Sequence, residues 1–309
     1  FFRVLWCSAM HERPTTQYVV YLALVLLAYH LLLGDRRRAS IVTDRITKPY
    51  GTWASPITSE LITSSSIGLG SPSVQLDPQG VPYVFWLEAR PLEKGRQVVV
   101  RHNTRTGETE DVTPAGDWNV RTRVHEYGGG EYFIADGQVY FSNFADQRLW
   151  VQHAFGPSQP RPLTPKGLDL RFANGVLDKQ RGRVLSVMED HTGGAAKEAV
   201  NSIVSIAISP KGEPARPQVL VSGRDFYAQP TLNAEANLLA WVCWDHPNMP
   251  WDNTDLFVAE IGPDGRPTAP RRVAGQRNES VTDPLFASSQ DLYFISDRSG
   301  WWNIYRVPL

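Results

Sequence analysis

The 309-residue chain carries 31 Lys and Arg against 32 Asp and Glu, and this balance excludes a general nucleic-acid binder, which needs a basic surface. Hydrophobic residues make up 42% of the chain, enough to form a buried core. The 24 Gly and 23 Pro favour short strands joined by turns over long helices.

Residues 1–45 form a leader that contains a hydrophobic segment. Positions 18–33 are apolar except for His30, and three arginines follow at 36–38. As a helix this segment spans roughly 24 Å, less than the ~30 Å hydrocarbon core of a bilayer. We expect a short hydrophobic helix and leave three interpretations open: a membrane anchor, a targeting signal, or a leader unrelated to the folded body. The expected location is cytoplasmic or organellar, and membrane-anchored if the segment is an anchor.

The body of the chain, residues 46–309, repeats one strand pattern. The pattern places Trp86, Phe141, Val187, Trp241 and Ile295 at equivalent positions, 46 to 55 residues apart. A turn precedes each of these strands and connects it to another, earlier strand. A third β-rich run comes after each, at 98–102, 148–151, 202–207, 255–259 and 302–306. A fourth run closes most units, at 110–113, 161–164, 218–220 and 271–273.

Four short strands in about 50 residues are typical of a β-propeller blade, in which each sheet covers the apolar face of its neighbour. The sequence therefore predicts an all-β propeller with four nearly complete blades and a fifth, from about Ser280, that lacks its outer strand. We expect the propeller to be truncated after about four and a half blades. The alternative is a closed five-bladed ring in which residues 57–67 exchange into the last blade.

Five longer motifs go beyond this spacing and resemble the N-terminal propeller of the prolyl oligopeptidase family, most closely its acylaminoacyl-peptidase and dipeptidyl-aminopeptidase branch. They lie at 51–58, 120–130, 140–149, 244–252 and 296–303. The resemblance implies a serine peptidase in which the propeller restricts entry to short peptides. It also implies a following α/β-hydrolase domain with a Ser, Asp and His triad. The sequence contains no G-x-S-x-G motif, so we expect the catalytic domain to be absent and the chain alone to be inactive.

The segment His125-Glu126-Tyr127, followed by glycines 128–130, is the first candidate for substrate binding. Glycines let a backbone approach a partner closely, and the polar side chains suit a charged peptide end. In dipeptide-releasing relatives, propeller glutamates bind the free α-amino group, which makes Glu126 the residue to test. The structural alternative is that the glycines mark a crowded strand entry and that Glu126 pairs with Arg121 or Arg123.

The loop 244–252 is the second candidate, with Asp245 and His246 as its binding residues. Its alternative role is an aromatic rim loop in which aspartates cap turns. Residues 297–300 are expected to form a hairpin turn with a hydrogen bond from Arg298 to Asp297, and Trp301 and Trp302 to pack in the core and rim.

No metal site or cofactor is predicted. The two cysteines, Cys7 and Cys243, are too few for a zinc site, and one His among scattered Asp residues lacks a ligand spacing. His102, His153 and His191 receive no role. The predicted partners are a peptide substrate and the hydrolase domain. A second hypothesis is a stand-alone propeller scaffold for protein interactions, without enzymatic activity.

Overall fold

The computed structural model describes residues 47–59, 61, 66–194, 198–209 and 211–309, which fall into two units divided between Ser66 and Ile67. In the first unit the Thr52 hydroxyl donates to the Pro49 carbonyl and closes a turn. The predicted hydrophobic segment 18–33 lies outside the described residues. Among the residues that are described, no helix is long and apolar enough to cross a membrane.

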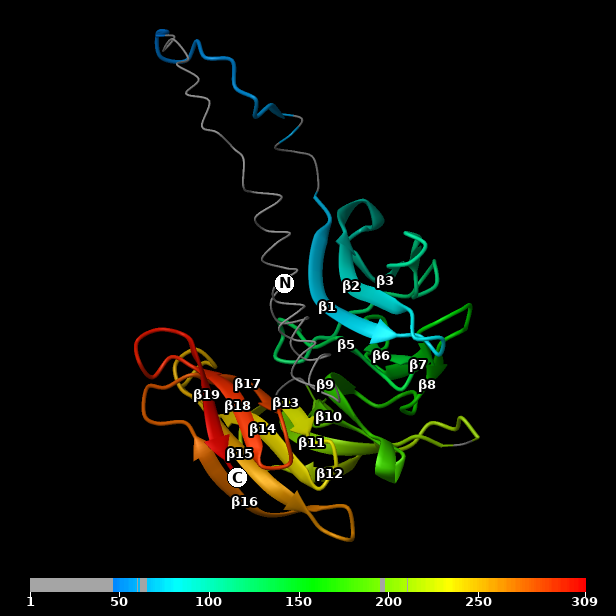
Figure 1. Ribbon diagram of the computed structural model, residues 1–309, viewed down its shortest axis with the longest axis vertical. Helices are drawn as coiled ribbons and strands as arrows, with labels where there is room; N and C mark the ends of the chain where they lie inside the picture. The colour runs from blue at the N-terminus through cyan, green and yellow to red at the C-terminus, as the bar shows by residue number, and fades with distance from the viewer. Residues whose placement is uncertain (1–46, 60, 62–65, 195–197, 210) are drawn as a thin grey trace, which may run out of the picture. The chain divides into compact units, whose positions relative to one another are not determined.

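The second unit consists of five antiparallel sheets that follow one another along the chain (Figure 1). The first sheet contains β1 (Gly68–Leu76), β2 (Pro82–Arg90), β3 (Arg96–Asn103) and β4 (Thr109–Asp111). The second contains β5 (Tyr132–Ala135), β6 (Gln138–Ser142), β7 (Leu149–His153) and β8 (Arg161–Pro162). Short 3₁₀ turns, η1 (Pro91–Glu93) and η2 (Lys179–Arg181), interrupt the connections.

The remaining three sheets repeat the same order. The third contains β9 (Leu170–Asp178), β10 (Arg183–Asp190), β11 (Val200–Ala207) and β12 (Gln218–Val221). The fourth contains β13 (Phe226–Leu232), β14 (Leu238–Trp244), β15 (Asp255–Ile261) and β16 (Pro267–Ala274). The fifth has three strands in the described part of the chain, β17 (Val281–Phe286), β18 (Asp291–Ser296) and β19 (Asn303–Pro308).

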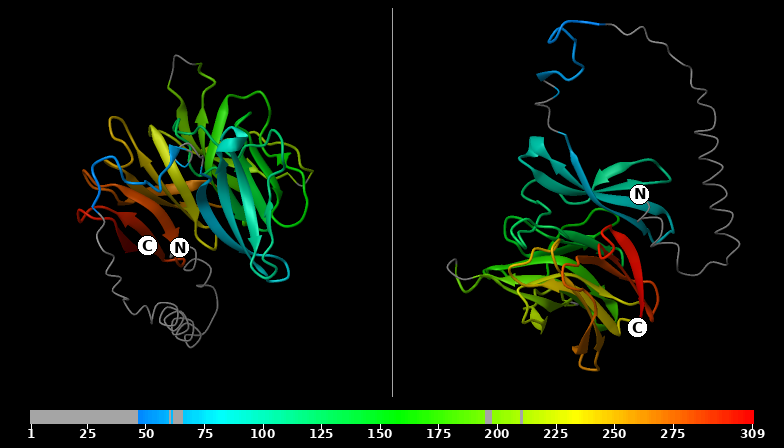
Figure 2. Two further views of the ribbon diagram at one scale, coloured as in Figure 1. Left: turned by 90° about the horizontal axis from the view of Figure 1, so that it is seen from above. Right: turned by 90° about the vertical axis from the view of Figure 1, so that its left-hand side faces the viewer.

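The sheets stack as propeller blades (Figure 2). Apolar clusters fill the spaces between neighbouring sheets. Phe85 and Phe141 belong to a cluster between the first two sheets, and Tyr140 and Phe172 to one between the second and third. Corresponding clusters join the third sheet to the fourth and the fourth to the fifth. Each sheet thus buries apolar side chains against the next, which confirms the predicted all-β propeller.

The repeat was predicted on the correct strands but not always on the same face: Val187 of the third sheet and Trp241 of the fourth pack in one cluster, so they face each other and are not equivalent. Trp86, Phe141, Val187, Trp241 and Ile295 all lie on the second strand of their sheets.

Two expectations at residues 297–302 were wrong. Arg298 pairs with the buried Glu279, at 2.7 Å, instead of Asp297. Trp301 is 80% exposed and Trp302 54% exposed, so neither belongs to the core. The turn itself forms as predicted between β18 and β19, with the Gly300 amide donating to the Asp297 carbonyl at 2.7 Å.

The first strands of neighbouring sheets adjoin one another, and most of them contain a β-bulge. The pairing register shifts in β1, β9, β13 and β17. At each shift one residue adopts the left-handed conformation: Ser71, Asn174, Gln229 and Asp283. Bulges bend a strand and redirect its side chains, so these four positions shape the inner side of the propeller. Neighbouring positions are linked, since the Asp283 amide donates to Gln229 Oε1 at 2.7 Å.

Cys243, on β14, offers a direct test of core packing. Its side chain is 1% exposed, and burial raises the pKa of the thiol to about 12. Because the thiolate is the reactive form, we expect a Cys7→Ser chain to show no reaction with a thiol reagent such as 5,5′-dithiobis(2-nitrobenzoate) at pH 8. One thiol should react after unfolding in guanidinium chloride. Rapid labelling of the folded chain would contradict the buried position.

Candidate functional site

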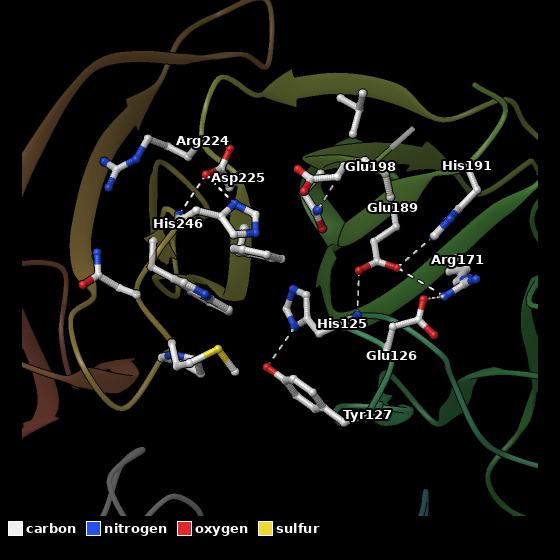
Figure 3. Close-up of a pocket in the computed structure, with 18 of the residues that line it drawn as sticks. His125, Glu126, Tyr127, Arg171, Glu189, His191, Glu198, Arg224, Asp225 and His246 are labelled. Carbon is white, nitrogen blue, oxygen red and sulfur yellow. Dashed lines mark hydrogen bonds and ion pairs between the residues drawn. The ribbon is translucent and has the colours of Figure 1, made fainter. Parts of the chain in front are cut away.

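A cavity of about 980 Å³ lies between the third and fourth sheets and the loop that precedes β5. Both predicted segments contribute to its wall, since His125, Glu126 and Tyr127 lie on one side and His246 on another (Figure 3). The strand ends of β9 and β10 supply Arg171 and Glu189. Five carboxylates line the cavity against two guanidinium groups, so the cavity favours a cation over an anion.

The first wall is a sharply turned backbone segment. His125 and Glu126 have φ of 55° and 62°, which is uncommon for residues with a side chain. The Gly128 amide donates to the Val124 carbonyl, and the Glu126 amide to the Arg123 carbonyl. Glu189 completes the support, because its Oε1 accepts a hydrogen bond from the His125 amide at 2.6 Å. The turn therefore presents three consecutive polar side chains to the cavity.

A charged cluster lies beside this turn. Arg171 donates to Glu126 Oε1 at 2.7 Å and lies 3.8 Å from Glu189 Oε2. His191 Nε2 lies 3.1 Å from the same oxygen of Glu189. The Glu189 side chain is 4% exposed and that of Glu126 is 78% exposed. The hydrogen bond and charge of Arg171 lower the pKa of Glu126, which therefore stays ionised at neutral pH.

Aromatic rings form the centre of the cavity wall. Phe226 and Trp244 stack with centroids 5.2 Å apart, and the His125 ring meets Trp244 edge-on at 5.1 Å. The His246 ring also contacts Phe226, with the ring centroids 4.9 Å apart. Such rings offer an apolar surface to a side chain and a negative face to a cation. The cavity thus combines one charged end with one aromatic end.

The second predicted segment is divided by the structure. His246 lines the cavity, where its Nδ1 lies 2.9 Å from Asp225 Oδ2. Asp245 is not among the lining residues; its carboxylate accepts hydrogen bonds from the Arg224 guanidinium and the Asp225 amide. The loop between β14 and β15 also contains the predicted aspartate cap, because Asp252 accepts from the Met249 amide at 3.0 Å.

The glycine triplet is crowded at two positions. A Cβ on Gly130 would lie 2.0 Å from Asn174 Nδ2, and one on Gly128 would lie 2.9 Å from the Thr122 carbonyl oxygen. Glu126 pairs with Arg171, whereas the alternative interpretation expected Arg121 or Arg123 as its partner. Those two arginines lie over the Phe144 ring instead.

Sequence reasoning missed Arg171, Glu189 and His191 as cavity residues. Arg171 and Glu189 are direct cross-strand partners in β9 and β10. A signal was available, because Arg171 near the start of β9 and Glu189 near the end of β10 carry opposite charges at the same end of an antiparallel strand pair. His102 and His153 lie elsewhere, next to Thr109 and Gln138 respectively. Among the described residues there is no group of three His, Cys, Asp or Glu side chains placed to hold a metal ion.

His125 makes the stability of this site depend on pH. Burial lowers the pKa of its imidazole, and the opposing charge of Glu189 only partly offsets this effect. The folded state therefore binds fewer protons than the unfolded state, whose histidine titrates near 6.5. Stability contributed by the neutral ring is complete above pH ~6.5 and is lost as the pH falls below it.

We expect the unfolding free energy of the wild-type chain to decrease more steeply than that of His125→Gln between pH 7.5 and 5. Urea denaturation at several pH values measures the unfolding free energy of both chains. The other histidines titrate in both chains, so their contribution cancels in the difference between the two free energies. Parallel pH profiles would contradict a buried neutral His125.

No protein-family model and no curated protein matches this sequence, but several solved structures do. A puromycin-hydrolyzing peptidase from Mycobacterium tuberculosis is 40% identical, with a TM-score of 0.73 over 86% of this chain and 41% of that chain. A puromycin hydrolase is 34% identical, with a TM-score of 0.71 over 85% of this chain and 40% of the other.

Prolyl oligopeptidase B from Galerina marginata shares the fold at 11% identity, with a TM-score of 0.51 over 78% of this chain and 36% of that one. The present chain spans about two fifths of the length of the peptidases it matches.

Proposed function

Because this chain is a peptidase propeller of the prolyl oligopeptidase family, we propose that its cavity binds the free amino end of short peptide substrates. The catalytic serine would belong to an α/β-hydrolase domain, since the 309 residues contain no G-x-S-x-G motif. The propeller would then position a substrate for that domain and exclude folded chains. By this proposal the chain has no hydrolytic activity alone.

The observation that carries the proposal is the charge imbalance around Arg171. This guanidinium group contacts two carboxylates, Glu126 and Glu189, and the second neighbour of Glu189 is the imidazole of His191, so the exposed Glu126 has room for one further positive charge. Glu126 is the accessible member of the cluster, and Arg171 keeps Glu189 as a neighbour when Glu126 turns to a ligand. An α-ammonium group has the charge and the donors to fill this position.

The aromatic end of the cavity supports the same class of ligand. A side chain attached to the bound ammonium group would meet the stacked rings of Phe226 and Trp244. Puromycin, for which three of the matched structures are named, carries a free amino group next to an aromatic side chain. We propose that compounds of this kind, amino-acid amides and short peptides, are bound here.

The outer face of the fifth sheet carries exposed apolar side chains. The fifth sheet has three strands in the described residues, and Leu285 and Ile304 expose apolar side chains, at 41% and 71%. We propose that in the whole protein a further strand and sheet cover this face. This part of the proposal does not affect the cavity, which lies between the third and fourth sheets.

Isothermal titration calorimetry of the 309-residue chain tests the binding proposal. L-phenylalaninamide should bind about tenfold more tightly than its N-acetyl derivative, since acetylation removes the positive charge. Glu126→Gln should abolish that preference, and Glu213→Gln, an exposed glutamate outside the cavity, should preserve it. Equal affinity for the two ligands in the wild-type chain would overturn the proposal.

A further inference from the structure

A second cavity, of about 390 Å³, adjoins the first on the inner side of the propeller. Four residues line both cavities: His125, Tyr127, Trp244 and Pro250. They form a shared wall, so a ligand that extends past this wall from the first cavity enters the second. The two spaces are therefore neighbouring parts of one binding region.

The two cavities differ in charge. The second is lined by glycine, amide, hydroxyl, aliphatic and aromatic residues, and none of them is Asp, Glu, Lys or Arg. The first has five carboxylates and two arginines. A charged group is costly to move into an uncharged, partly enclosed space. The second cavity is therefore suited to the uncharged part of a ligand whose charged end occupies the first.

More than one polar group in the second cavity is available to a ligand. The Nε2 atom of His125 has no hydrogen-bond partner among the described residues. The Asn174 amide also has none within the described part of the chain, and its Nδ2 lies 2.0 Å from the position that a Cβ on Gly130 would take. The other amide, Gln229, is already engaged: its Oε1 accepts from Asp283 and Thr282, and its Nε2 donates to Asp283. The bulge in β9 directs Asn174 to this position.

The remaining walls suit a peptide main chain. Gly129 lines the cavity with nothing within 4 Å of the position its Cβ would take, so a ligand backbone can approach closely there, whereas Gly128 and Gly130 are covered by Thr122 and Asn174. Trp251 and Trp302 also line it and are 62% and 54% exposed, which provides an apolar surface open to solvent. An amide group between flat apolar surfaces offers hydrogen bonding to a peptide bond and contact to an uncharged side chain.

From these features we infer that the second cavity is a subsite for the uncharged residues that follow the amino-terminal residue of a bound peptide. Asn174 hydrogen-bonds the peptide main chain, and Trp302 covers the adjacent side chain. The inference rests on the proposed function, because it places the amino end of the same peptide at Glu126. It adds a preference for peptides whose second and third residues are uncharged.

Calorimetry with two probes tests the subsite on the 309-residue chain. L-phenylalaninamide reaches only the first cavity, whereas the tripeptide amide Phe-Ala-Ala-NH2 extends into the second. We expect Trp302→Ala to lower the affinity for the tripeptide amide about tenfold and to change the affinity for phenylalaninamide by no more than about twofold. Trp301→Ala is the matched control, since Trp301 is exposed and lines neither cavity; it should change neither affinity.

A second variant addresses the amide. Asn174→Gly keeps the left-handed backbone and removes the side chain, and it should also weaken only the tripeptide amide. Equal affinities of wild type and both variants for the tripeptide amide would overturn the subsite. The subsite would also be overturned if the variants lost the same affinity for phenylalaninamide as for the tripeptide amide. Glu126→Gln separates the two proposals. If this variant binds both probes as tightly as the wild type does, amino-end binding at Glu126 is contradicted, whatever the result for Trp302→Ala.

Discussion

Replacement of Asp178 by alanine is expected to lower the free energy of unfolding by about 3–5 kcal/mol, the usual cost of breaking a buried ion pair from one side. The Asp178 carboxylate is completely buried and accepts from Arg183 Nε at 2.8 Å and from Arg181 at 3.2 Å. Arg183 is itself buried, so the substitution leaves its charge without a counter-ion.

The position of this cluster explains why its loss should affect the whole propeller. Arg183 also donates to the Gly265 carbonyl, and Arg181 to the Ala236 carbonyl, so the two arginines connect the third sheet to turns of the fourth. Denaturant titration of the 309-residue chain measures the change. Arg306→Ala, which removes one partner of an exposed pair with Asp291, should leave the midpoint unchanged. Equal effects of the two substitutions would show that Asp178 is not a buried counter-ion.

Replacement of Gly130 by alanine is expected to lower the unfolding free energy by roughly 3 kcal/mol, through left-handed strain and overlap together. Gly130 has φ of 65°, and its added Cβ would meet both the amide side chain and the backbone nitrogen of Asn174. The Gly130 carbonyl accepts a hydrogen bond from that nitrogen at 2.9 Å, so a displacement also strains the link between the second and third sheets.

Gly137→Ala separates strain from overlap. Gly137 has φ of 69°, close to that of Gly130, but nothing lies within 4 Å of its added Cβ. Gly137→Ala should lower the unfolding free energy by only about 1 kcal/mol, which is the cost of the left-handed backbone strain alone. Denaturant titration of both variants gives the difference. If the two alanine variants were equally stable, Asn174 would not pack over Gly130.

The propeller could be predicted from the sequence because its pattern is local. Each second strand, such as the one around Trp241, follows a turn and carries apolar residues for two neighbouring sheets. The recurrence of such a strand every 46 to 55 residues then defines the repeat. The bulges at Asn174 and Gln229 were not predicted, since nothing in a strand's composition shows which residue adopts a positive φ.

The candidate site was predicted in part. The sequence pointed to two segments, and the structure brings His125 and His246 to one cavity although they are far apart in the chain. Their partners depend on the pairing of β9 with β10, which places Arg171 opposite Glu189. Asp245 supports the site from behind the wall, because its carboxylate is held by Arg224. A sequence motif indicates which segments contribute to a site. Which of their side chains face the cavity depends on the register of strand pairing, which the motif does not contain.

The most direct test of the central claim is hydrolysis of L-phenylalanine 4-nitroanilide by the protein expressed from its complete gene, compared with the N-acetyl substrate and with the Glu126→Gln variant. We expect cleavage of the free-amine substrate, a KM about tenfold higher in Glu126→Gln with kcat little changed, and no cleavage by the 309-residue chain alone. Equal cleavage of free and acetylated substrates, or an unchanged KM in the variant, would contradict the claim.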